Sequence, residues 1–144
     1  MLSTDKIKYL LSHGENKQVE FKKCTDKVSA SVYETVCSFL NAEGGYIFLG
    51  VDDDGTILGI NPKCVTDITK SIINTLNNLE QFLPPMPITP EQTEIDGKII
   101  LYLNVPESEQ VHRYKNRFYD RWGDADNDVS KHTYLVKNMF MRKE

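Results

Sequence analysis

One stretch, from Asn41 to Gly55, constrains the fold more than any other part of this chain. Its two consecutive glycines allow a backbone with positive φ after a helix at little steric cost. The apolar run 46–51 has no polar alternation, which predicts a central strand covered on both faces. The sequence Asp-Asp-Asp-Gly at 52–55 then predicts a turn toward a second strand over 56–60. Three carboxylates at the end of a buried strand form either a functional site or an ordinary solvated turn.

The remaining chain alternates between helical and strand patterns. Apolar stripes at helical spacing predict helices after Ser3 or Thr4, over 29–40, from Pro62 to Leu79, and from Ser130 to Phe140. Alternating or apolar segments predict strands over 15–23, on both sides of Asp96-Gly97, and over 118–122. We therefore expect one α+β domain over residues 1–144, with a mixed β-sheet of about six strands and flanking helices.

Composition limits the classes of function. The net charge is −4 and the pI about 5.4, so a contact with nucleic acid requires a local basic patch. The three cysteines, Cys24, Cys37 and Cys64, lack the close spacing of a disulfide framework or a structural zinc site, and Cys37 lies on an apolar helical face. The N-terminus lacks a signal-peptide pattern and no apolar run is long enough to span a membrane, so we expect a cytoplasmic protein.

An acidic set of Glu15, Glu20 and Asp53 is the first candidate site. Glu15 and Glu20 would point to opposite faces of one continuous strand, so they converge only if Glu15 belongs to the turn after Gly14. Converging carboxylates bind a hard cation such as Mg²⁺ or Mn²⁺, which can activate water and stabilise charge on a phosphodiester. The alternative is that these are solvated surface charges.

A basic and aromatic segment over 112–121 is the second candidate site. Its cations can neutralise phosphates and its aromatic rings can stack on bases. The alternative is a hairpin with aromatic core residues and solvated cations. The candidate nucleic-acid-binding residues are Arg113, Lys115, Arg117 and Arg121, with Lys22 and Lys23 beside the acidic set.

Motifs for other chemistries are missing from the sequence. It contains no GxxxxGK[ST], and its glycines do not spell GxGxxG, so no ATP site is supported. The histidines are scattered without metal-ligand spacing, and no GxSxG occurs.

The ordered motifs of this chain resemble the Schlafen AlbA_2 domain family. The resemblance is carried by Glu15 with Val19-Glu20-Phe21-Lys22, by the segment 36–60 and by the aromatic-Arg-Gly strand 118–123. It implies an α+β nucleic-acid-binding domain. In RNA-cleaving members the catalytic acids fall on Glu15, Glu20 and Asp53 of this sequence.

Two classes of function follow from the residues and the resemblance together. One is a divalent-metal-dependent endoribonuclease that uses Glu15, Glu20 and Asp53. The other is a non-catalytic module that binds RNA or DNA, as in a transcriptional regulator. Schlafen proteins join two such lobes around a nucleic-acid groove, which also predicts a homodimer.

Overall fold

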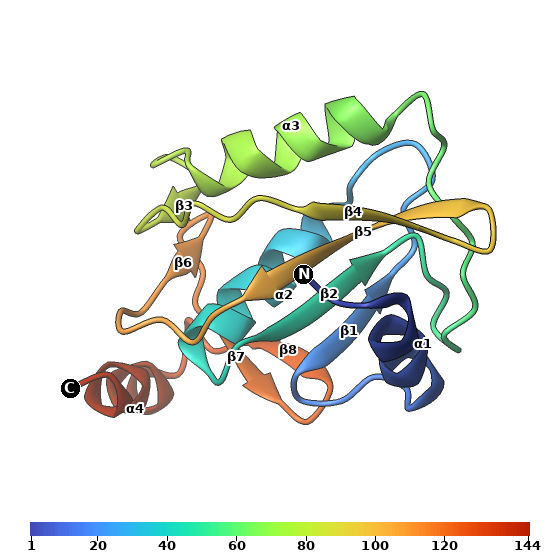
Figure 1. The fold of residues 1–144 in the computed structure, drawn as a ribbon. Coiled ribbons are helices and arrows are strands. Elements are labelled where there is room, and N and C mark those ends of the chain that lie inside the picture. Colours follow the sequence, from blue (N-terminus) through green and yellow to red (C-terminus); the bar gives the residue numbers. More distant parts are fainter.

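The computed structural model describes residues 1–144 and contains four helices and eight strands (Figure 1). The helices are α1 (Thr4–Ser12), α2 (Ala30–Asn41), α3 (Val65–Leu76) and α4 (Thr133–Arg142). The strands are β1 (Val19–Lys22), β2 (Gly45–Leu49), β3 (Phe82–Leu83), β4 (Glu91–Ile95), β5 (Lys98–Val105), β6 (Arg113–Tyr114), β7 (Tyr119–Trp122) and β8 (Ala125–Asp128). The α+β class predicted from the sequence is confirmed.

A mixed sheet of four strands organises the molecule in the order β1-β2-β5-β4. β1 and β2 are parallel, whereas the other pairs are antiparallel. The expected hairpin around Asp96-Gly97 joins β4 to β5, and Asp96 has the positive φ of 52° that such a turn requires. The pairs β3-β6 and β7-β8 form separate two-stranded sheets, so the prediction of one sheet of about six strands was wrong in this detail.

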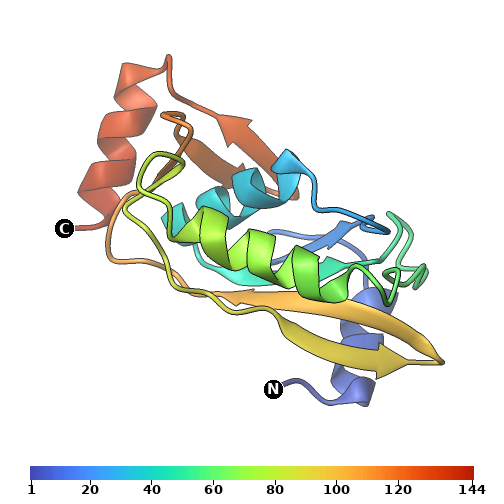
Figure 2. The same ribbon diagram turned by 90° about the horizontal axis from the view of Figure 1, so that it is seen from above.

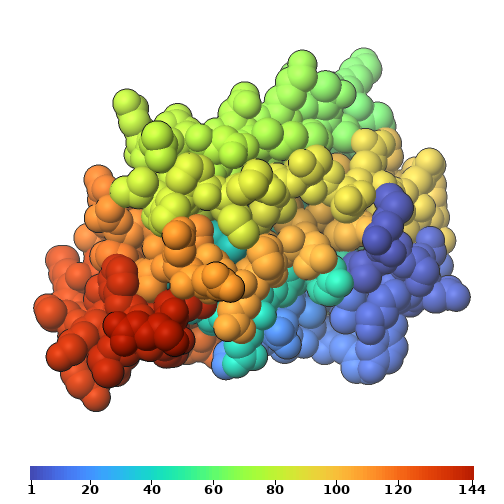
Figure 3. All heavy atoms as spheres, turned by 60° about the vertical axis from the view of Figure 1, so that its left-hand side comes forward, coloured from blue at the N-terminus to red at the C-terminus, as the bar shows by residue number.

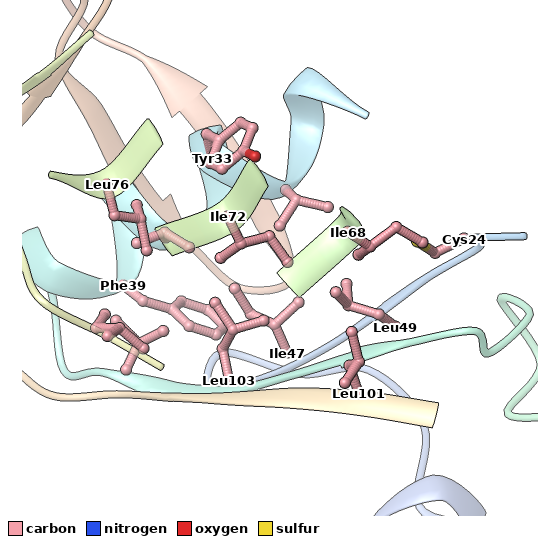
Figure 4. Packing of buried hydrophobic residues seen from close by; sticks show 14 of the residues in the cluster. Cys24, Tyr33, Phe39, Ile47, Leu49, Ile68, Ile72, Leu76, Leu101 and Leu103 are labelled. Atoms are coloured by element: carbon pink, nitrogen blue, oxygen red, sulfur yellow. The ribbon is translucent and has the colours of Figure 1, made fainter. Parts of the chain in front are cut away.

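Helices cover both faces of the main sheet (Figure 2). On one face, Ile47 and Leu49 of β2 pack with Phe39 of α2 and Ile72 of α3 (Figure 4). On the other face, α1 packs against the apolar side chains of β1, β2 and β5, including Phe48. β2 is therefore a central strand with two buried faces, as its unbroken apolar sequence predicts.

Two glycines let α2 turn directly into β2. Gly44 has φ +75°, and a Cβ placed there would lie 2.5 Å from the backbone oxygen of Val105. At Gly45 a Cβ would collide with the backbone oxygen of Gln18. Only glycine fits this close approach of the chain to β5 and to the start of β1.

Three local predictions differ from the structure. No strand forms over 56–60, because Gly59 has φ +84° and only an isolated bridge joins Val51 to Ile57. Leu79 lies beyond the end of α3 and is exposed. Ser130 does not cap α4, because the helix begins at Thr133 with His132 at its N-cap; the Ser130 hydroxyl instead accepts a hydrogen bond from the backbone N–H of Phe118.

The β7-β8 hairpin packs against α2, and α4 lies beside it at one end of the molecule (Figure 1). Asn41, at the end of α2, fixes this arrangement. Its amide donates to the backbone oxygens of His112 and Tyr119, and its Oδ1 accepts from the backbone N–H of His112.

None of the helices has the length and apolar character needed to cross a bilayer.

Candidate functional site

The acidic pair, Glu15 and Glu20, lies at the outer edge of β1. Glu20 is buried and pairs in register with Ile47, so its side chain points to the face covered by α2. The predicted strand over 15–23 is shorter in the structure and begins at Val19, so Glu15 lies before it, after Gly14, which is the position that convergence with Glu20 needed. Its Oε2 accepts a hydrogen bond from the backbone N–H of Phe21 at 3.1 Å. The structure thus brings Glu15 and Glu20 together.

The pKa of Glu20 is raised to about 8, first by burial and then by hydrogen bonding with Glu15. The nearby charge of Lys22 and the hydrogen bond from Arg121 act in the opposite direction. A carboxyl group with this pKa is mostly protonated at neutral pH, and a general acid or base works best when its pKa lies near the working pH. A cation bound at the pair would favour the ionised form instead.

Arg121 is an internal residue, which corrects its assignment to a nucleic-acid-binding surface. Its side chain is 0% exposed. The guanidinium lies 3.0 Å from Glu20 Oε1 and 2.8 Å from Asp126 Oδ1, and it donates to the backbone oxygens of Asn16 and Lys17. All of its hydrogen-bonding capacity is directed into the protein, so it positions Glu20 and ties β7 to β1.

Asp53 is not part of the acidic pair in this conformation. It is exposed in the turn after β2, and its backbone N–H donates to the side chain of Asp52. No group of three or more His, Cys, Asp or Glu side chains in residues 1–144 is arranged to hold a metal ion. A metal site formed by Glu15, Glu20 and Asp53 together stays a prediction.

The two lysines near the acidic pair differ in environment. Lys22 extends from β1, with its ammonium 3.8 Å from Glu20 Oε2 and its side chain only 16% exposed. Lys23 is exposed and lies 3.4 Å from Asp52. Lys22 therefore belongs to the wall of the site, whereas Lys23 forms an exposed ion pair with Asp52, a type of contact that is weak.

The basic-aromatic surface is smaller than predicted and consists of Arg113, Lys115 and Arg117. Arg113 lies over the ring of Phe118, and Lys115 is exposed at the tip of a tight turn. Arg117 forms an ion pair of 2.7 Å with Asp128. His112 of the same segment is buried and structural.

Asp126 is a residue of the site that sequence reasoning missed. It accepts hydrogen bonds from Thr35 and Ser38 of α2 and forms the second ion pair of Arg121. Arg121 and Asp126 face each other across the β7-β8 hairpin. The Gly123-Asp124 turn could have revealed this pairing, because it predicts a two-residue hairpin.

The fold and this edge site define a mixed-sheet α+β domain in which a buried arginine joins a carboxyl pair to a neighbouring hairpin. The Schlafen, AlbA_2 family model matches residues 15–130, and the chain belongs to this family. The match includes the acidic pair, Asp53 and the β7-β8 hairpin.

This chain matches only a part of two known proteins and most of the length of a third. It is 35% identical over 72 residues to an uncharacterized ATP-binding protein, UU034, of Ureaplasma parvum; the match covers 48% of this chain and 20% of the relative. The DIP2311 protein of Corynebacterium diphtheriae has a similar fold, with a TM-score of 0.60 at 15% identity over 85% of this chain and 27% of that chain. The N-terminal domain of a putative ATP-dependent DNA helicase RecG-related protein of Nitrosomonas europaea gives a TM-score of 0.56 at 26% identity, covering 74% of each chain.

Proposed function

We propose that this chain binds nucleic acid, with RNA as its substrate, and that the acidic pair is the centre of a divalent-metal-dependent endoribonuclease site. The observation that carries the proposal is the pair itself: two carboxyl groups in contact at a sheet edge, one with a pKa raised to about 8. Membership in the Schlafen AlbA_2 family and similarity to a helicase-related domain support a function on nucleic acid.

The acidic pair supplies carboxylate oxygens, the donor type that Mg²⁺ and Mn²⁺ prefer. Mg²⁺ is commonly held by one or two carboxylates and completes its shell with water and substrate phosphate. Glu15 and Glu20 would supply the carboxylates, and Asp53 would join them after a change in the turn at 52–55. The metal would supply an activated water and neutralise charge on the phosphodiester. Lys22 contributes positive charge beside the same position.

The direct test is incubation of structured and unstructured RNA with the protein in Mn²⁺ or in EDTA, followed by gel analysis. We expect cleavage with Mn²⁺, none with EDTA, and strong loss for Glu15→Gln and Asp53→Asn. Glu94→Gln, at an exposed position of β4, is the matched control. Equal cleavage by the parent and Asp53→Asn would remove Asp53 from the site, and no cleavage by the parent under any condition would refute the nuclease.

A non-catalytic binding module is the second candidate, favoured by the separation of Asp53 from the acidic pair. In that case the protein binds RNA or DNA without metal, and Asp53→Asn strengthens binding because a negative charge is removed. Binding is measured by fluorescence anisotropy at low and moderate salt. Absence of binding at low salt would refute both candidates.

We also propose a homodimer that places two such domains around one nucleic-acid groove. A symmetric pair would provide the second wall that a single sheet edge lacks. Multi-angle light scattering with and without RNA tests this, and a monomer at high concentration in both samples would contradict it.

A further inference from the structure

A pocket of about 550 Å³ has Arg121 among its lining residues, the same arginine that contacts Glu20. It is formed where the turn before β1, the end of α2, β7 and the end of α4 meet. Figure 3 shows this end of the molecule, with the C-terminal helix in red beside the orange segment that leads into β7. Its size falls in the range of small-molecule sites. We call it the Trp122 pocket; its wall also contains Lys17, Arg142 and Lys143.

Trp122 is the only tryptophan of the chain and is 47% exposed although it follows a buried residue of β7. Its indole Nε1–H donates to Asp120 Oδ2 at 3.1 Å, so the polar edge of the ring is satisfied and its orientation is held. An exposed indole held in this way offers a surface on which an unpaired base can stack.

Cations lie in the same pocket. Arg142 is fixed by hydrogen bonds to both carboxylate oxygens of Asp120. The ammonium of Lys143 donates to the backbone oxygen of Leu40 at 3.2 Å, which leaves two of its three N–H groups for a ligand. Lys17 forms an exposed ion pair with Glu43, a type of contact that contributes little and is easily exchanged.

Glu107 also lines the pocket and interacts electrostatically with Lys143. Its carboxylate opposes the arrival of an anion at that lysine. A pocket that binds a phosphate at Lys143 must therefore bind it more tightly when Glu107 is neutral. This gives a test in which a substitution raises affinity instead of lowering it.

We infer that the Trp122 pocket holds one unpaired nucleotide of a nucleic-acid strand, with its base on Trp122 and its phosphate on Lys143 and Lys17. The inference rests on the proposed binding of nucleic acid. Arg121 links the two sites, because it donates both to Glu20 and to the backbone oxygen of Lys17.

Intrinsic fluorescence tests the stacking, because Trp122 is the sole indole reporter. Titration with an unlabelled single-stranded oligoribonucleotide of about ten nucleotides should quench it. A duplex of the same sequence and free AMP serve as comparison ligands. Quenching by AMP at the same concentration as the strand would overturn the strand as the source of the nucleotide, and equal affinity for the duplex would overturn the unpaired base.

Anisotropy with a fluorescein-labelled strand tests the individual residues. Trp122→Ala should weaken binding about 5- to 160-fold, the range expected for loss of one stacked base. Lys143→Ala should weaken it and reduce its salt dependence, whereas Glu107→Gln should strengthen it. Tyr134→Ala and Lys70→Ala, at exposed positions of α4 and α3, are the matched controls and should bind like the parent.

The outcomes separate this inference from the proposed function. If the parent protein binds no nucleic acid at low salt, the proposed function fails and the inference fails with it. If the parent binds but Trp122 is not quenched, and Trp122→Ala and Lys143→Ala bind like the parent, only the Trp122 pocket is refuted. Thermal melts of each variant identify any loss that is due to unfolding.

Discussion

Replacement of Arg121 by alanine should remove a large part of the free energy of unfolding of this protein. The side chain is 0% exposed and contacts two carboxyl groups, Glu20 and Asp126, together with two backbone oxygens. Removing one partner of a buried ion pair costs about 3–5 kcal/mol, and here the mostly buried carboxylate of Asp126 would be left without its partner. Domains of this size have a total stability of about 5–15 kcal/mol.

The assay is urea denaturation followed by circular dichroism, with melting temperature as a second readout. A loss of 3–5 kcal/mol corresponds to a fall in Tm of roughly 10–15 °C for a chain of this length. Arg121→Lys keeps the charge but loses the planar fork, so it should lie between the parent and Arg121→Ala. It remains measurable if the alanine variant does not fold. Arg113→Ala, on the basic-aromatic surface, is the control and should change stability by less than about 1 kcal/mol.

One combination of results would refute the structural role of Arg121. If Arg121→Ala unfolds within about 1 kcal/mol of the parent and loses its affinity for nucleic acid, Arg121 is a binding residue and its structural assignment is wrong. If both arginine variants lose stability while Arg113→Ala loses only affinity, the division between internal and surface arginines stands.

Three further predictions concern other parts of the molecule. The folded pKa of Glu20, about 8, lies above its ordinary value of 4.5, so its contribution to stability is present at low pH and is lost as pH rises through this window. The Tm of the parent should therefore fall relative to that of Glu20→Gln between about pH 4.5 and pH 8, and a constant difference would contradict the raised pKa. Gly44→Ala should cost more than Gly97→Ala in urea denaturation, because both have similar φ but only Gly44 lies against backbone atoms; equal costs would contradict the close approach. Asn41→Leu should lower the free energy of unfolding by about 2–4 kcal/mol, since three backbone groups lose their partner, and a loss below 1 kcal/mol would argue against the role of Asn41.

Elements whose sequence pattern is local could be predicted from the sequence. The unbroken apolar run of β2, the Asp96-Gly97 hairpin and the apolar stripe of α2 each specify their own structure, and the structure contains all three. The alternation of side chains along a strand gave only a condition for Glu15: it could meet Glu20 if it lay in the turn after Gly14, and the structure places it before β1.

The environment of charged residues could not be derived in the same way. Arg117 and Arg121 lie four positions apart in one basic segment, yet one is at the surface and the other is fully enclosed. That difference depends on β7 packing against α2 and against the start of β1, which are contacts over long sequence separation. The position of Asp53 likewise depends on how the turn at 52–55 packs, because Gly55 closely approaches the end of α1.

The way in which the outer edge of β1 is covered has a consequence for self-association. An edge strand exposes unpaired N–H and C=O groups that can recruit a strand from another molecule. Here the N–H of Phe21 is occupied by the side chain of Glu15, and the carbonyls of Asn16 and Val19 are occupied by Arg121. Side chains thus take the place of a neighbouring strand along this edge, and the same two residues that shape the acidic site protect the sheet from edge-to-edge aggregation.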